Sequence, residues 1–128
     1  MKSLKKTGLV IMVIAYLIAG FNHFYNPSSY WHVIPAHILY PHTANTLAGL
    51  FEILFGLMLI FNQTRRLAAW GIILMLIAFL TVHIDMVIRA PFLLGGSIVV
   101  TPFIAWVRLI VLQPLLIWWA WWYTRSDN

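Results

Sequence analysis

The sequence predicts an all-α fold, a polytopic membrane protein built as a bundle of four transmembrane helices. Of its 128 residues, 62% are hydrophobic and only 9% are charged, and the mean hydropathy is +0.89. So few charges cannot cover the surface of a small soluble domain, in which about a quarter of the residues are normally charged. Because a spanning helix takes about 20 residues, the chain has room for four spans in a single domain, residues 1–128.

Turn-forming residues divide the chain into four apolar runs. The segment 62–66, with sequence NQTRR, predicts a tight cationic turn, and Pro91 with Gly95-Gly96 marks a later connection. Pro102 suits the first turn of a helix, and the tryptophans near the C-terminus are typical of a membrane surface. We therefore expect helices at about 7–23, 43–61, 67–88 and 102–123.

An external interfacial segment is predicted between the first two helices, at 22–43. It contains three prolines and four of the five histidines, but no lysine or arginine. Its tyrosines and Trp31 suit the headgroup level of a bilayer, where such rings collect. A cap on the bundle is favoured over a re-entrant catalytic loop.

The cations predict an orientation. If the N-terminus is cytoplasmic, Arg89 is the only external cation, and Arg108 lies within a span. The positive-inside rule then places both termini in the cytoplasm. The formal net charge of +5 is thus a topology signal, and no nucleic-acid partner is implied. Six cations lie on the cytoplasmic side: Lys2, Lys5, Lys6, Arg65, Arg66 and Arg125.

Cysteine is absent, which excludes disulfides and Cys-ligated metals. His32, His37 and His42 are spaced by five residues, which matches no standard zinc signature, so no metal site is predicted. We also find no ligands for haem or an iron–sulfur cluster.

Polar residues inside the apolar runs are the candidates for ligand-binding or proton-linked roles. A charge near the bilayer centre costs about 2.5–3.5 kcal/mol on insertion scales, so such groups usually face the protein interior. Six residues qualify: His23, Glu52, His83, Asp85, Arg108 and Gln113.

Helical spacing predicts how these groups meet. Glu52 shares a face with Gly49 and Gly56, which allow close helix approach. Counted at 1.5 Å per residue, Glu52 and Arg108 both lie about 10–14 Å deep, so they can form a pair near the midplane. Such a pair either carries function or only fixes the helix register, and the two interpretations weigh about equally.

Three further expectations concern helix faces. His83 and Asp85 are two residues apart, about 200° around a helix, so they cannot both face one cavity. Asp85 is instead expected on a small-residue face with Gly71 and Ala78. Pro114 frees a backbone carbonyl and predicts a kink in the fourth helix, with Gln113 able to satisfy that carbonyl or to hold a ligand.

The polar positions also resemble the DoxX-like family of small four-helix membrane proteins, over most of the chain. The segments that carry the resemblance are AGFNHF, AGLFEILFGLMLI, QTRRLAAWG, HIDM and VRLIVLQPLLIWW. The resemblance implies a bundle in the bacterial cytoplasmic membrane. It also implies quinone-coupled redox service or an accessory role in oxidative-stress complexes. Its pattern points to His23, Glu52, Arg108 and Gln113, whereas HIDM departs from the usual N-I-x-M and adds two titratable groups.

Three functions are compatible with this pattern. The first is a membrane subunit that binds a quinone-like or other apolar small molecule, and a quinone is the only cofactor that this pattern suggests. The second is an assembly factor with a structural polar network, and the third is an enzyme using acid–base chemistry on a lipid. Whether the protein is an enzyme is left open. The expected partners are the lipid bilayer and either another protein or a second copy of the chain.

Overall fold

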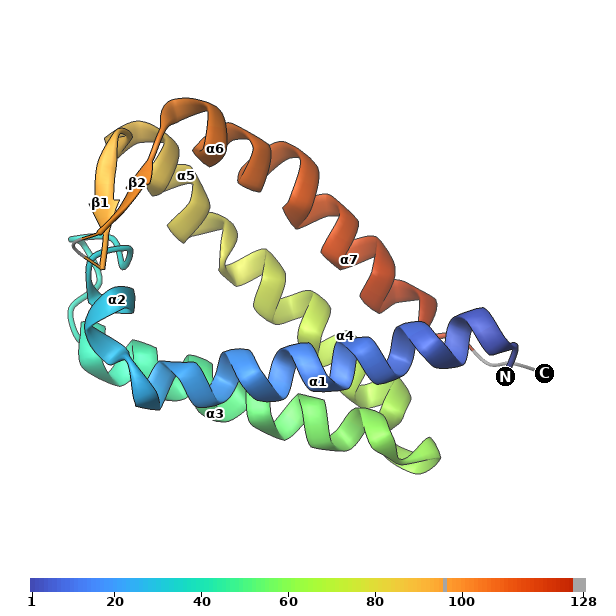
Figure 1. Ribbon diagram of the computed structural model, residues 1–128. Coiled ribbons are helices and arrows are strands. Elements are labelled where there is room, and N and C mark those ends of the chain that lie inside the picture. The colour runs from blue at the N-terminus through green and yellow to red at the C-terminus, as the bar shows by residue number, and fades with distance from the viewer. Residues whose placement is uncertain (96, 126–128) are drawn as a thin grey trace.

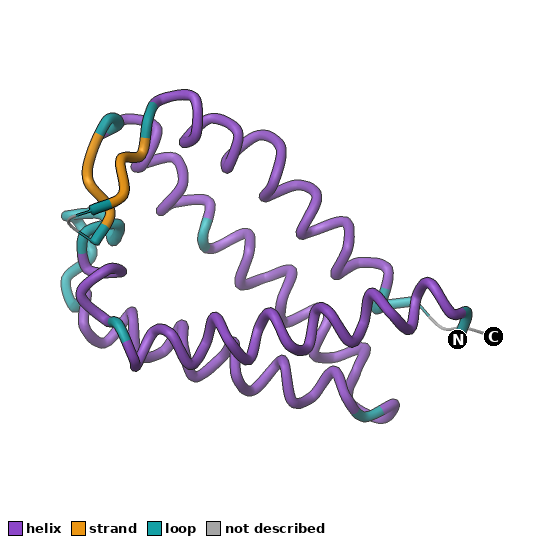
Figure 2. Tube along the Cα trace, viewed as in Figure 1, coloured by secondary structure: helices purple, strands orange, loops and turns teal. Residues whose placement is uncertain are grey.

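The computed structural model describes residues 1–95 and 97–125. It confirms four helical segments that are long and apolar enough to cross a membrane (Figure 1). The first and third begin several residues earlier than expected, and the fold is mainly helical (Figure 2). The four segments are Ser3–Tyr25, Pro41–Ile60, Asn62–Arg89 and Pro102–Trp122.

The first half of the chain forms a helical hairpin. Helix α1 (Ser3–Tyr25) packs along α3 (Pro41–Ile60). The short helix α2 (Pro27–Trp31) lies where the two helices are joined. The predicted interfacial segment therefore contains one short helix, and the last turn of α1 extends into it.

The second half of the chain forms another hairpin, in which both spans are interrupted. The third span consists of α4 (Asn62–Ala78) and α5 (Leu80–Arg89), broken at Phe79. The fourth consists of α6 (Pro102–Val107), a π-helical turn η1 (Arg108–Leu112) and α7 (Gln113–Trp122). Helix α4 packs on both α3 and α7, which joins the two hairpins.

An unexpected β-hairpin connects α5 to α6. Strands β1 (Phe92–Leu94) and β2 (Ile98–Val100) pair antiparallel, with Phe92 opposite Val100. Gly95 supplies the positive φ of +61° at the turn, a conformation that costs glycine little. The predicted turn at this place is therefore correct, but the strands on either side of it were not foreseen.

Two glycines set the closeness of α1 and α3. A Cβ added at Gly20 would lie 2.8 Å from the carbonyl oxygen of Gly49, and one added at Gly49 would lie 2.8 Å from Cβ of His23. Small residues at a helix crossing let the backbones approach. The predicted face of α3 is confirmed, because Gly49, Glu52 and Gly56 are all buried.

The predicted turn at 62–66 is wrong, because only Phe61 separates α3 from α4. The last carbonyls of a helix lack intrahelical partners, and here Arg65 reaches back to them. Its Nε donates to the Leu59 oxygen at 2.8 Å and its Nη2 to the Ile60 oxygen at 3.0 Å. Thr64 Oγ1 donates to the Met58 oxygen at 2.6 Å. These contacts allow α4 to start at once.

The expected face of Gly71, Ala78 and Asp85 is also wrong, because Ala78 is exposed. Gly71 and Asp85 are only half-buried, so these three residues do not form a buried stripe. The buried residues of α4 are instead Ala68, Ala69, Ile72, Ile73 and Leu76.

The apolar core lies toward the end of the molecule that holds the start of α1, the end of α7 and the α3–α4 turn, which we call the terminal end (Figure 1). The opposite end holds α2 and the β-hairpin, and we call it the loop end. Polar side chains replace apolar ones between the helices toward the loop end. The apolar core consists of Leu9, Met12, Tyr16, Leu59, Ala68, Ala69, Ile72, Ile73, Leu76, Ala120 and Tyr123.

Candidate functional site

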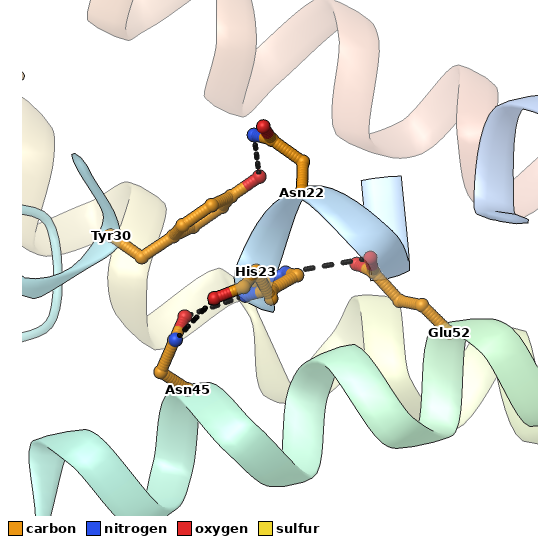
Figure 3. A network of polar contacts seen from close by, with 5 residues as sticks. All are labelled: Asn22, His23, Tyr30, Asn45 and Glu52. Atoms are coloured by element: carbon orange, nitrogen blue, oxygen red, sulfur yellow. Dashed lines mark hydrogen bonds and ion pairs between the residues drawn. The ribbon is translucent and has the colours of Figure 1, made fainter. Parts of the chain in front are cut away.

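Five polar side chains from α1, α2 and α3 gather toward the loop end. We call them the His23 cluster, and Figure 3 shows how they face one another. His23 lies in the last turn of α1, and the close crossing at Gly49 brings it against α3. The cluster consists of Asn22, His23, Tyr30, Asn45 and Glu52.

Asn45 fixes the orientation of the His23 ring. Its Nδ2 donates to the His23 carbonyl oxygen at 3.0 Å, so its Oδ1 is left to accept. That oxygen lies 2.6 Å from His23 Nδ1, which assigns a proton to Nδ1. The other ring nitrogen, Nε2, is thereby directed to Glu52.

His23 Nε2 lies 3.4 Å from Glu52 Oε2, and both side chains are buried. This separation is within ion-pair range, but it is long for a hydrogen bond, and Glu52 Oε2 has no hydrogen-bond donor. Since Nδ1 carries a proton, the pair is either an imidazolium beside a carboxylate or a neutral imidazole beside a carboxylic acid. The two forms differ by the position of one proton.

Tyr30 covers the His23 ring. The two rings stack with centroids 3.8 Å apart and planes inclined by 21°, and Asn22 Nδ2 donates to the Tyr30 hydroxyl at 2.7 Å. Burial raises the pKa of this hydroxyl, and the charge of Glu52 adds to the effect, against the bond from Asn22. Tyr30 therefore keeps its proton at neutral pH and can act as a donor.

A second polar group lies in the other hairpin. Arg108 Nη1 donates to Gln113 Oε1 at 2.5 Å, and Gln113 Nε2 donates to the Leu76 oxygen of α4 at 2.6 Å. In an α-helix, residues five apart point about 140° away from each other. The π-helical turn, in which the Gln113 N–H donates to the Arg108 oxygen, brings the two side chains together.

The kink predicted at Pro114 takes the form of this π-helical turn. Proline has no N–H, and its ring clashes with the carbonyl four residues back in a regular α-helix. The wider π-helical turn accommodates both the missing N–H and the bulk of the proline ring. The side chain of Gln113 binds Arg108 and α4, so it does not satisfy the carbonyl that Pro114 frees.

The expected pair between Glu52 and Arg108 does not form. Glu52 faces His23, and Arg108 is bound by Gln113 in the opposite hairpin. Depth along a helix, on which the prediction rested, does not determine which neighbour a side chain faces. The buried residue Tyr16 of α1 is close enough to interact electrostatically with both.

His83 and Asp85 have separate surroundings. Asp85 accepts from Arg89 at 2.6 Å, one turn along α5. Arg89 also donates to the backbone oxygens of His32 at 2.9 Å and Val33 at 3.3 Å, which fastens the interfacial segment to α5. His83 instead interacts electrostatically with Arg108, and its buried Nδ1 has no hydrogen-bond partner among the described residues.

Sequence reasoning missed Tyr30 and Asn45 as members of the His23 cluster. Tyr30 was assigned to the headgroup level from its aromatic character, which does not separate a polar contact from lipid exposure. Asn45 did carry a signal, since an amide within a spanning helix usually bonds across to another helix. Among residues 1–95 and 97–125, no three His, Cys, Asp or Glu side chains are grouped to hold a metal ion.

One family model, described as a domain of unknown function (DUF8561), matches residues 12–124. The chain belongs to the DUF8561 family. No curated protein and no solved structure matches it. The matched range contains the whole His23 cluster as well as Arg108 and Gln113, so both polar groups lie within the DUF8561 domain.

Proposed function

We propose that this DUF8561 protein is a multi-pass protein of the bacterial cytoplasmic membrane that binds an apolar small molecule with a polar head, most simply a quinone, in redox or stress-related service. The observation that carries the proposal is the presence of two buried polar atoms without hydrogen bonds, Glu52 Oε2 and His83 Nδ1. Buried polar groups in proteins are normally paired, so these two unpaired atoms favour a ligand that completes them.

Membrane insertion is supported by the surface of the four segments. Large apolar side chains stay exposed along their length, for example Ile18 at 65%, Leu74 at 67% and Trp118 at 66%. A soluble protein of this size rarely exposes contiguous apolar area of this extent. An apolar ligand can therefore enter from the surrounding lipid.

The polar groups are suited to a carbonyl or hydroxyl head. Reduction of a quinone carbonyl to a hydroxyl needs a proton at the oxygen, and the His23–Glu52 pair holds one proton between two sites. Arg108 adds a positive charge within electrostatic reach of Tyr16. Electrons would come from a partner protein. The DoxX-like resemblance supports the same redox assignment.

The test is binding of decylubiquinone to the purified protein in detergent, together with solvent extraction of any quinone that copurifies. Glu52→Gln removes the charge and the exchangeable proton and should weaken binding at least tenfold. Asp85→Asn is the matched acid-to-amide control, because Asp85 belongs to the contact with Arg89 rather than to the His23 cluster. Equal affinities for the wild type and Glu52→Gln would sink the proposal.

A structural role is the second candidate, and one observation favours it: Asn45 and His23 join α1 to α3 through two contacts. In that case Glu52→Gln should lower the melting temperature and the yield, with no quinone found in any preparation. Melting curves of the same variants separate the two functions. A stable Glu52→Gln protein that has lost quinone binding supports the ligand site.

A further inference from the structure

A groove of about 950 Å³ opens at the terminal end, far along α1 from the His23 cluster. The first turns of α1, the start of α4 and the end of the chain after α7 form its sides. Its volume is that of a site for a small organic ligand. The proposed function does not use this groove.

Five of the eight lysines and arginines of the chain line the groove. Neither of the two acidic residues in the described part of the chain, Glu52 and Asp85, does so. The third acid, Asp127, lies outside the described residues. The groove is therefore strongly basic. Its cations are Lys5, Lys6, Arg65, Arg66 and Arg125.

Neutral groups position the charges of Arg65 and Arg125. The guanidinium of Arg65 donates to backbone oxygens of α3 and to Asn62 Oδ1, contacts that hold it in place and leave its charge uncompensated. The Arg125 guanidinium lies 4.6 Å from the ring centre of Trp121. The side chains of Lys6 and Arg66 are exposed at the rim and make no hydrogen bond or ion pair with another described residue. These cations can therefore bind an anion.

Below the basic rim, the lining of the groove is aliphatic. Val10 and Ile14 lie one helical turn apart on α1, and the side chain of each is 51% exposed. Ile60, at the end of α3, is 46% exposed. A site that is cationic at the mouth and aliphatic along a helix matches an anionic headgroup with an attached acyl chain. An acidic peptide or a free anion would use only the mouth.

We propose that this groove binds one anionic phospholipid, with its phosphodiester at Lys6, Arg66 and Arg125 and an acyl chain along Val10 and Ile14. The inference requires membrane insertion but not the quinone site. Anionic lipids are enriched in the cytoplasmic leaflet, and basic pockets between spans bind their headgroups. The groove lies at the end of the molecule that the cation count assigns to the cytoplasm.

Native mass spectrometry of the intact protein, released from micelles doped with lipid, tests the proposal. Phosphatidylglycerol should bind at least tenfold more tightly than phosphatidylcholine with the same chains. Each groove cation should contribute about fivefold, so Lys6→Gln weakens phosphatidylglycerol binding about fivefold and the double variant Lys6→Gln/Arg66→Gln about 25-fold. Lys2→Gln is the matched control, because Lys2 does not line the groove, and should change binding less than twofold.

Three results would overturn the proposal. Equal binding of the two lipids would show that no anion is recognised. An equal loss in Lys2→Gln and Lys6→Gln would assign the effect to overall surface charge. Competition by millimolar glycerol 3-phosphate would identify a soluble phosphate site instead of a lipid site. Decylubiquinone binding to Lys6→Gln/Arg66→Gln should match that of the wild type, which separates failure of this site from failure of the quinone site.

Discussion

At the scale of single residues, the polar side chains act by satisfying backbone groups as much as by pairing with each other. Arg65 binds the final carbonyls of α3, Arg89 binds two carbonyls of the interfacial segment, and Gln113 binds one at the end of α4. Backbone groups without water nearby need such partners. The sequence singles out Arg89 as an external cation and Gln113 as a polar residue within a span, and it counts Arg65 among the cytoplasmic cations, but charge type and spacing do not specify a carbonyl as the partner of any of them.

Replacement of Arg65 by lysine should destabilise the turn between α3 and α4. A lysine keeps the charge but cannot direct several donors in a planar fork, so at least one carbonyl loses its partner. We expect a loss of about 1–2 kcal/mol, measured as a lower melting temperature in detergent. Arg66→Lys is the control and should melt like the wild type. Equal melting of both variants would contradict the capping role of Arg65.

At the scale of the elements, glycine spacing predicted the packing face of α3 correctly but could not give the partners on that face. The chosen pair of Glu52 and Arg108 rested on depth alone, whereas the crossing at Gly20 and Gly49 aligns Glu52 with His23. The β-hairpin was missed because each of its strands has only three residues. Such short apolar runs do not differ from the spans around them.

At the crossing of α1 and α3, alanine substitutions at two glycines should change the stability of the protein in opposite directions. Gly49→Ala brings a Cβ to 2.8 Å from His23 Cβ and 3.0 Å from the Gly20 oxygen, so we expect a loss of about 1–3 kcal/mol. Gly56→Ala meets the flexible end of Leu17 at 3.1 Å and gains up to about 1 kcal/mol of helix propensity.

Thermal unfolding in detergent measures both variants. Gly49→Ala should also weaken decylubiquinone binding, because it displaces the His23 ring. If Gly49→Ala were as stable as Gly56→Ala, the account of the close helix crossing would be wrong.

At the scale of the whole molecule, composition and turn signals were sufficient to predict four spanning helices. The start of α1 and the end of α7 lie at one end of the molecule (Figure 1), as an even number of spans requires. The kink near Pro114 was predicted, but neither its π-helical form at 108–112 nor the break at Phe79 could be predicted from composition. Gln113 joins both interruptions through its contacts with Arg108 and Leu76.

Single cysteines can test the membrane topology, since the chain has no cysteine of its own. Three spans separate Ser3 from Ser97, so Ser3→Cys and Ser97→Cys should lie on opposite sides of the membrane. In intact cells, an impermeant maleimide should label Ser97→Cys, and it should label Ser3→Cys only after the membrane is permeabilised. Labelling of both in intact cells would contradict the four-span arrangement, and the reverse pattern would contradict the orientation.

The central claim is that a quinone-like molecule binds beside the His23–Glu52 pair, and photoaffinity labelling with an azido-ubiquinone tests it most directly. Peptide mapping should find adducts in the segments 16–30 and 45–56, and excess decylubiquinone should suppress them. Glu52→Gln should lose these adducts, while Asp85→Asn keeps them. Adducts spread evenly over the exposed apolar side chains, unaffected by decylubiquinone, would contradict the claim.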